Sequence, residues 1–357
     1  MDNAPQQNRN DNLQMLRFFA AAFVLLTHIT FYIHERVDNS VGVWHVGEVG
    51  VPIFFVISGF VMHLSSSRIP RNSDGARVFM HRRISRIFPL YWLITIVKLG
   101  IALAVPAAVL HNAPDLMHSL GSLVLFPMFN SEGQIRPMHG VAWTLLHEML
   151  FYYIFAIAMV LRQSPYVFST VAITGMWVAG LFIQPESALA YVCTDRINLM
   201  FVAGMSLSAW IAAGRTVHRT LGLVMLAVAA AALLGADGAI FAFIHGYNID
   251  AALIVAAAMA LRLNALPSLK RLLVSLGDSS YSLYMLHPIL APAICVLLLA
   301  LQIRSPLVIV PVAFVACVTA ANLLYRYIEN PLNELAKRHL GKVFLKPSPS
   351  HAAAKGS

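Results

Sequence analysis

The sequence predicts an all-α protein, a polytopic integral membrane bundle of about ten transmembrane helices. Of its 357 residues, 59% are hydrophobic and only 11% are charged, and the mean hydropathy is +0.71. A soluble domain carries about 25% charged residues. The apolar residues form continuous runs and do not alternate with polar ones, which favours helices over the strands of an outer-membrane barrel.

Ten apolar runs are long enough to cross a bilayer, although several are near the lower limit of length. An eleventh run, residues 116–129, has only fourteen residues and predicts a short re-entrant or interfacial segment. In chain order the ten predicted spans are residues 13–33, 49–64, 84–105, 141–161, 167–183, 197–213, 221–235, 249–263, 276–301 and 307–327.

The charged residues indicate that both termini lie in the cytoplasm. With ten spans, the loops on the cytoplasmic side hold most of the arginine and lysine, and the outer loops are mainly acidic. A full span at residues 116–129 would move Arg215, Arg219, Lys270 and Arg271 to the outside. The net charge of +9 therefore reflects membrane topology and not a nucleic-acid partner.

The sequence predicts one transmembrane domain, residues 13–335. A short polar N-terminus, residues 1–12, precedes it, and a basic, partly disordered cytoplasmic tail, residues 336–357, follows it. The first run has no cleavage site of the signal-peptide type, so we expect it to be retained as a span. The three cysteines are scattered and suggest neither a disulfide framework nor a metal motif.

Ionisable residues inside the predicted spans mark a candidate site, because such groups are costly in a membrane. Arg17 and His28 are eleven residues apart, about three turns and roughly 16 Å along one helix face. Arg17 then lies near the cytoplasmic surface and His28 in the outer half of the membrane. Glu148, with His147 beside it, lies roughly 10 Å below the outer surface. Two further polar residues at a similar level are Ser58 and His287.

An imidazole beside a carboxylate can take a proton from a hydroxyl nucleophile, because the carboxylate fixes the tautomer and stabilises the imidazolium. A buried carboxylate needs a partner, which makes His28 and Glu148 a candidate catalytic pair. Arginine suits a phosphate-rich ligand that arrives from the cytoplasm, because its guanidinium group binds phosphate through two hydrogen bonds. The arginines at the predicted inner mouth are Arg17, Arg82, Arg83 and Arg86.

Six motifs in order resemble the acyltransferase 3 family of membrane proteins and cover about residues 12–335. The first is Arg17 followed, after ten residues, by His28. The motif from Trp143 to Tyr152, Trp-Thr-Leu-Leu-His-Glu-Met-Leu-Phe-Tyr, looks most like the exopolysaccharide O-acetyltransferase branch. The other four motifs are residues 50–60, with Ser58-Gly59, residues 83–92, with Arg83, Arg86 and Pro89, residues 281–288, with Tyr284 and His287, and residues 327–331.

The resemblance implies O-acylation of a carbohydrate at a bacterial inner membrane. The donor would be acyl-CoA, in the first instance acetyl-CoA, on the cytoplasmic side, with no tightly bound cofactor and no metal. The acceptor would be a hydroxyl of a surface or secreted polysaccharide or of its lipid-linked precursor. The resemblance implies catalytic roles for His28 and Glu148 and acyl-CoA binding by Arg17, Arg83 and Arg86. Further residues that could line the site are Ser58, Trp143, His147, Tyr284 and His287.

The chain departs from the family pattern at two places. Pro52 stands where the family often has an acidic residue, and Leu146-His147 stands where the polysaccharide branch often has Asn-Tyr. The second departure could alter contacts with the acceptor. The resemblance leaves open the acyl group, the acceptor sugar, the oligomeric state and the choice between a general-base and an acyl-histidine mechanism.

Two other classes of function are compatible with the sequence. Ten spans with intramembrane charges also suit a transporter or flippase of a glycolipid, although no inverted repeat of the kind many transporters carry is evident. A membrane hydrolase would need Ser58 as its nucleophile, but Ser58 beside Gly59 is more typical of close helix packing. A zinc site of the His-Glu-x-x-His type is not completed after His147-Glu148, because residue 151 is Phe.

Overall fold

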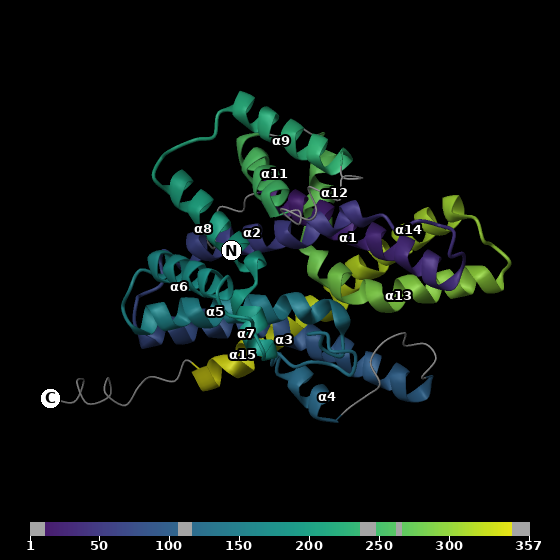
Figure 1. The fold of residues 1–357 in the computed structure, drawn as a ribbon, viewed down its shortest axis with the longest axis horizontal. Helices are drawn as coiled ribbons and strands as arrows, with labels where there is room; N and C mark the ends of the chain where they lie inside the picture. The colour runs from purple at the N-terminus through teal and green to yellow at the C-terminus, as the bar shows by residue number, and fades with distance from the viewer. Residues whose placement is uncertain (1–10, 106–115, 236–247, 262–265, 345–357) are drawn as a thin grey trace, which may run out of the picture. The chain divides into compact units, whose positions relative to one another are not determined.

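The computed structural model describes residues 11–105, 116–235, 248–261 and 266–344. Within these residues all regular structure is helical, which confirms the predicted all-α class (Figure 1). The chain folds as two compact units. Met1–Met62 and Leu199–Tyr325 form unit 1, and His63–Asn198 and Arg326–Ser357 form unit 2. Each unit is described by itself.

Unit 1 contains the N-terminal helices and most of the C-terminal half. The last turn of its second helix already belongs to unit 2. Its elements are α1 (Asp11–Arg36), the 3-10 turn η1 (His45–Val49), α2 (Gly50–Ser66), α8 (Leu199–Ala212), α9 (Arg219–Leu234), α11 (Asn248–Ala260), α12 (Pro267–Asp278), α13 (Ser280–Ala300) and α14 (Pro306–Leu324).

The first helix, α1, organises unit 1 because it packs against α11, α12, α13 and α14 (Figure 1). The apolar core around it includes Leu25 and Ile29 of α1 and Cys295 of α13. On α14, the small buried residues Ala313 and Cys317 are four positions apart. Small side chains at that spacing let membrane helices approach closely.

Polar contacts fix the start of α1. The Asn12 side-chain amide donates hydrogen bonds to the carbonyl oxygens of Ala258 and Leu261, each at 2.9 Å. Asp11 forms an ion pair with Lys270 of α12 at 2.8 Å. These contacts hold α11 and α12 to α1.

Two glycines bring α2 and α8 into backbone contact. A Cβ atom at Gly59 would overlap the carbonyl oxygen of Phe201, and one at Gly204 would overlap the carbonyl oxygen of Val56. The rings of Phe55 and Phe201 stack beside this contact, with centroids 4.7 Å apart. Gly59 therefore has the close-packing role that small residues play between membrane helices.

Unit 2 contains the middle of the chain and the C-terminal helix. Its longest helix is α3, which packs against α5 and α15. Its elements are α3 (Ser73–Ala104), α4 (Leu116–Leu123), the 3-10 turn η3 (Gly140–Ala142), α5 (Trp143–Val160), α6 (Pro165–Gly180), α7 (Ala188–Thr194), the 3-10 turn η4 (Arg196–Asn198), the π-helical turn η5 (Tyr325–Glu329), whose first residue belongs to unit 1, and α15 (Asn330–Phe344).

Aromatic side chains join α3 to α5. The ring of Phe79 stacks on Phe155 at 4.9 Å and meets the edge of Tyr152 at 5.9 Å. In the contact between α3 and α15, Nε2 of the buried His81 lies 2.9 Å from the carbonyl oxygen of Lys337. Because a carbonyl oxygen can only accept, His81 donates. These contacts position the face of α3 that carries Arg83.

The short helix α4 is held by two aromatic residues of α3. The Tyr91 hydroxyl donates to the carbonyl oxygen of Ser122, and the Trp92 indole donates to that of Leu123 at 2.7 Å. Helix α4 has eight residues, about 12 Å, so it cannot cross a bilayer of roughly 30 Å. The predicted segment 116–129 is thus a short helix that ends at Leu123 and continues as turns and irregular chain.

Six helical stretches among the described residues are long and apolar enough to cross a membrane, and the chain is an integral membrane protein. Helices also lie at the other four predicted positions, but α6, α8, α9 and α11 have only 13 to 16 residues. The count of ten spans is therefore not confirmed and stays a prediction. The six stretches are Asp11–Arg36, His45–Ser66, Ser73–Ala104, Gly140–Val160, Ser280–Ala300 and Pro306–Lys342.

Two predicted spans differ in extent from the observed helices. Helix α3 begins at Ser73 and not at residue 84, because the Asn72 side chain accepts a hydrogen bond from the Gly75 backbone at 2.8 Å and caps a polar first part. The predicted span 276–301 is interrupted at Ser279, where α12 ends and α13 begins. The break follows Gly277, whose missing side chain lets the backbone of Gln14 approach.

The predicted tail, residues 336–357, begins within α15, which continues to Phe344. Helix α15 packs against α3 and is amphipathic, with apolar and charged residues at helical spacing. Residues 1–10 of the predicted N-terminus and residues 345–357 of the tail lie outside the described residues.

Cysteine labelling in intact cells tests the ten-span topology. In a variant whose three cysteines are replaced by alanine, we expect Gln163→Cys to be cytoplasmic and Glu186→Cys to react with a membrane-impermeant maleimide from outside. The reason is that α4 adds no crossing between the Arg-rich loop before α3 and the loop after α5. Arg71→Cys is the control, since it precedes α4 and is cytoplasmic in either topology. Labelling of Gln163→Cys and protection of Glu186→Cys would contradict the prediction.

Candidate active site

The candidate residues of unit 1 begin with Arg17, which lies on the same continuous helix as His28. The half-buried Arg17 donates a hydrogen bond from Nε to the hydroxyl of Ser280 at 3.2 Å. Ser280 is fully buried and starts α13, the helix that carries His287. Arg17 thus links the N-terminal parts of α1 and α13. This contact was not evident from the sequence.

His28 and His287 lie next to one another in unit 1. Their ring centroids are 4.7 Å apart and the ring planes are 70° from parallel. Nδ1 of His28 lies 2.9 Å from the carbonyl oxygen of Val24, and Nδ1 of His287 lies 3.1 Å from that of Leu283. Because each carbonyl can only accept, each Nδ1 carries a hydrogen, and Nε2 is the basic nitrogen of both neutral rings.

Aromatic side chains surround this histidine pair. Tyr284, which is one turn before His287, has its ring 5.8 Å from that imidazole, and Phe54 of α2 lies 6.1 Å from Tyr284. Tyr32 lies 6.3 Å from His28. His287 is 1% exposed. The two imidazoles are therefore held in a largely apolar setting. The low local dielectric there makes electrostatic interactions between groups stronger than in water.

Ser58 lies on α2 and is half-buried. Its neighbour Gly59 makes the backbone contact with α8 described above. This contact gives the motif a function in helix packing that does not require Ser58 to be a nucleophile. The role of Ser58 itself stays a prediction.

In unit 2, Arg83 is buried within the aromatic contact between α3 and α5. Its guanidinium carbon lies 5.7 Å from the Phe79 ring centroid and 6.0 Å from that of Tyr152. It is 8% exposed, and its Nε has no hydrogen-bond acceptor among the described residues. Aromatic faces stabilise such a cation, so Arg83 is placed as an interior group and not as a surface arginine.

Three of the four arginines of α3 differ in exposure. Arg82 is exposed, Arg86 is half-buried and Arg83 is buried. A phosphate group that arrives from solution reaches exposed and half-buried cations first. Arg83 and Arg86, which the motif treats alike, therefore lie in two different environments.

Glu148 accepts a hydrogen bond from the hydroxyl of Tyr152, one turn further along α5. Glu148 and Tyr152 both interact electrostatically with Arg83. Carboxylate, phenol and guanidinium thus form one polar group inside unit 2, drawn from two sequence motifs. His28 belongs to unit 1, and the predicted His28–Glu148 pair stays a prediction.

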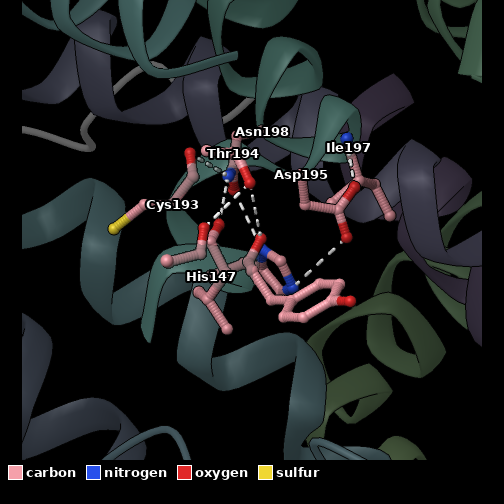
Figure 2. A network of polar contacts seen from close by, with 9 residues as sticks. His147, Cys193, Thr194, Asp195, Ile197 and Asn198 are labelled. Carbon is pink, nitrogen blue, oxygen red and sulfur yellow. Dashed lines mark hydrogen bonds and ion pairs between the residues drawn. The ribbon is translucent and has the colours of Figure 1, made fainter. Parts of the chain in front are cut away.

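His147 belongs to a separate polar network of unit 2, which Figure 2 shows. Nδ1 of His147 lies 3.0 Å from Oδ1 of Asn198, and Nε2 lies 3.8 Å from Oδ2 of Asp195. The Asn198 amide donates to the carbonyl oxygen of Val192 at 2.7 Å. Trp143 packs against the imidazole at right angles, with centroids 5.6 Å apart.

The structure thus brings together His28 with His287 and Tyr284, Arg83 with Glu148, and Trp143 with His147, each within one unit. Sequence reasoning missed four partners of these residues. Tyr152 had a signal, since it stands four residues after Glu148 inside a motif. The others, Ser280, Asp195 and Asn198, had none because they are common polar residues in turns or at a helix end.

Comparison with known proteins identifies the family. The sequence profile of the acyltransferase domain of the acyltransferase 3 family matches residues 10–326. The exopolysaccharide production protein ExoZ of Rhizobium meliloti (strain 1021) is 32% identical over 300 residues, which cover 80% of this chain and 90% of ExoZ. The acyltransferase MdmB of Streptomyces mycarofaciens is 26% identical over 324 residues, 79% of each protein.

A third relative, nodulation protein 10 of Rhizobium leguminosarum bv. viciae, is 29% identical over 171 residues, which cover 42% of this chain and 44% of that protein. No solved structure matches the chain. The family profile spans most of the chain, and its matched region contains every candidate site residue. The chain therefore belongs to the acyltransferase 3 family of integral membrane acyltransferases.

Proposed function

We propose that the protein transfers an acyl group, in the first instance acetyl, from cytoplasmic acyl-CoA to a hydroxyl of a surface or secreted polysaccharide or of its lipid-linked precursor. Membership of the acyltransferase 3 family and the similarity to ExoZ support this proposal. We place it in the inner membrane of a bacterium, with both termini in the cytoplasm. The observation that carries the chemistry is the orientation of His28, whose Nδ1 is bound to the Val24 carbonyl so that Nε2 is the basic nitrogen.

The proposed reaction uses His28 as a general base. Nε2 takes the proton from the acceptor hydroxyl as its oxygen attacks the thioester carbonyl carbon. A carbon–oxygen ester bond forms, the carbon–sulfur bond breaks, and the imidazolium returns the proton to the departing thiolate of coenzyme A. The second route, in which Nε2 carries the acyl group before the hydroxyl attacks, uses the same nitrogen.

His287 stabilises the imidazolium that forms on His28 in this scheme. An edge-to-face arrangement places the electron-rich face of one ring against the electron-poor edge of the other. A positive charge on one of the two rings strengthens that attraction, while charging both at once is opposed by repulsion at this separation. The pair is thus suited to carry one positive charge at a time.

The family resemblance implies that Arg17, Arg83 and Arg86 bind the phosphates of acyl-CoA. The half-buried Arg86 is better exposed for this task than the buried Arg83. We propose that Arg83 acts mainly on Glu148, because the buried guanidinium attracts the neighbouring carboxylate. Tyr152 then fixes the direction of that carboxylate through its hydrogen bond.

Transfer of radiolabelled acetyl from acetyl-CoA to a polysaccharide and glycolipid fraction tests the proposed function. We expect labelled carbohydrate with wild-type membranes and a loss of about 100-fold or more with His28→Ala, the size that removal of a general base produces. His34→Ala is the matched control, because His34 lies on the same helix and its Nδ1 bonds the Val41 carbonyl, away from the candidate residues. A fully active His28→Ala variant contradicts the mechanism, and the absence of label with wild type contradicts the reaction.

Replacement of His287 tests the imidazole pair. We expect His287→Ala and His287→Gln to lower kcat roughly tenfold or more, with KM for acetyl-CoA unchanged. Added imidazole should restore part of the activity of His287→Ala, because it returns an aromatic ring to the place beside His28. Wild-type kcat in His287→Gln would contradict the proposed role of His287.

Tyr152→Phe removes one hydroxyl and leaves the ring that packs against Phe79. Loss of a hydrogen bond to a carboxylate is worth about 1.5–3 kcal/mol, so we expect kcat to fall about tenfold or more. Tyr153→Phe is the matched control, since the adjacent Tyr153 is 51% exposed. Equal kcat values for the two variants, measured at matched expression, would show that the hydrogen bond between Tyr152 and Glu148 does not contribute to the reaction.

A further inference from the structure

The network around His147 has a fixed hydrogen-bonding sense. The amide nitrogen of Asn198 donates to the carbonyl oxygen of Val192 at 2.7 Å and lies 3.5 Å from that of Cys193. This fixes the amide orientation, so Oδ1 of Asn198 is the atom that faces His147 at 3.0 Å. An amide oxygen can only accept, and Nδ1 of His147 therefore carries the hydrogen. In the neutral ring, Nε2 is an acceptor.

Asp195 presents a second acceptor to the same place. One of its carboxylate oxygens, Oδ1, accepts from the backbone N–H of Ile197 at 2.9 Å, which holds the side chain in position. The other, Oδ2, faces Nε2 of His147 at 3.8 Å (Figure 2). That separation is longer than a direct hydrogen bond. Two acceptors that face one another at this distance suit a ligand that brings donors to both.

The burial of the two residues gives this arrangement a direction. The side chain of His147 is 5% exposed, whereas that of Asp195 is 40% exposed. The pair is thus accessible from the Asp195 side, with the imidazole at its inner end. Trp143 is half-buried against the imidazole and supplies an apolar ring at the same end of α5.

The chemistry of the pair favours a neutral polyol. A carboxylate repels phosphate and other anions. Among the described residues no group of three or more His, Cys, Asp and Glu side chains could hold a metal ion. Two neighbouring hydroxyl groups of a sugar ring carry two donors a few ångströms apart, and they match two acceptors 3.8 Å apart.

We propose that His147 and Asp195 bind two neighbouring hydroxyl groups of the acceptor carbohydrate and help to select the acceptor. This deepens the proposed function and rests on it. In the ten-span topology the pair lies toward the outside, from which the acceptor would arrive, and the acyl-CoA donor would arrive from the other side.

Asp195→Asn tests the proposal with minimal change of shape. Asparagine keeps an oxygen for the Ile197 backbone and replaces the second acceptor by a donor. We expect KM for the acceptor to rise about tenfold or more, the size expected for loss of a hydrogen bond to a charged group. KM for acetyl-CoA and the slow hydrolysis of acetyl-CoA by water should not change. His147→Gln is a second variant that should shift the same constant.

Glu48→Gln is the matched control. It makes the same carboxylate-to-amide change in another histidine–carboxylate pair, His45–Glu48, which is exposed in η1 at 2.7 Å. We expect it to leave every constant unchanged. An Asp195→Asn variant with wild-type acceptor KM, or with acceptor and donor KM raised equally, overturns the proposal.

A binding measurement separates this inference from the proposed reaction. Saturation-transfer NMR of methyl β-galactoside and methyl α-mannoside, with the protein in lipid nanodiscs, needs no turnover. We expect signal with wild type and Glu48→Gln and a reduction of at least fivefold with Asp195→Asn. No signal with wild type, or equal signal with Asp195→Asn, overturns the subsite whatever the transfer assay gives. Absence of labelled product with wild type contradicts the reaction alone.

Discussion

A polar side chain inside a membrane helix must find its partner within the protein, because lipid offers none. Three candidate residues illustrate this constraint. Arg17 reaches the hydroxyl of Ser280, and His28 uses a carbonyl of its own helix. Glu148 accepts from Tyr152.

The neighbours of the two key ionisable residues change the view of the chemistry. The sequence suggested a histidine–carboxylate pair of the kind that orients a general base in many hydrolases. Within its own unit, His28 has a second imidazole at 4.7 Å, and the carboxylate of Glu148 has a phenol and a buried guanidinium. The tautomer of His28 is set by a helix carbonyl, so this base does not depend on a carboxylate for its orientation.

The donor and acceptor ends of the proposed reaction require different kinds of polar group. Arginines on α3 offer positive charge for a phosphate-rich donor, and they range from exposed to buried along one helix turn. The network of His147, Asp195 and Asn198 presents acceptors and a carboxylate. In the proposed scheme this contrast helps to keep the anionic donor away from the acceptor's site, because a carboxylate repels phosphate.

The sequence by itself determined the helical membrane class, the family and the helix that carries Arg17 and His28, because continuous apolar runs and ordered motifs are local properties of the chain. It did not determine the polar start of α3, the break at Ser279 or the amphipathic helix α15, because caps, close backbone contacts and helix packing do not raise hydropathy. Only the tertiary structure decided the partners His287 and Asp195. Residues far apart in sequence become neighbours through packing, and no spacing rule encodes which polar groups then face each other.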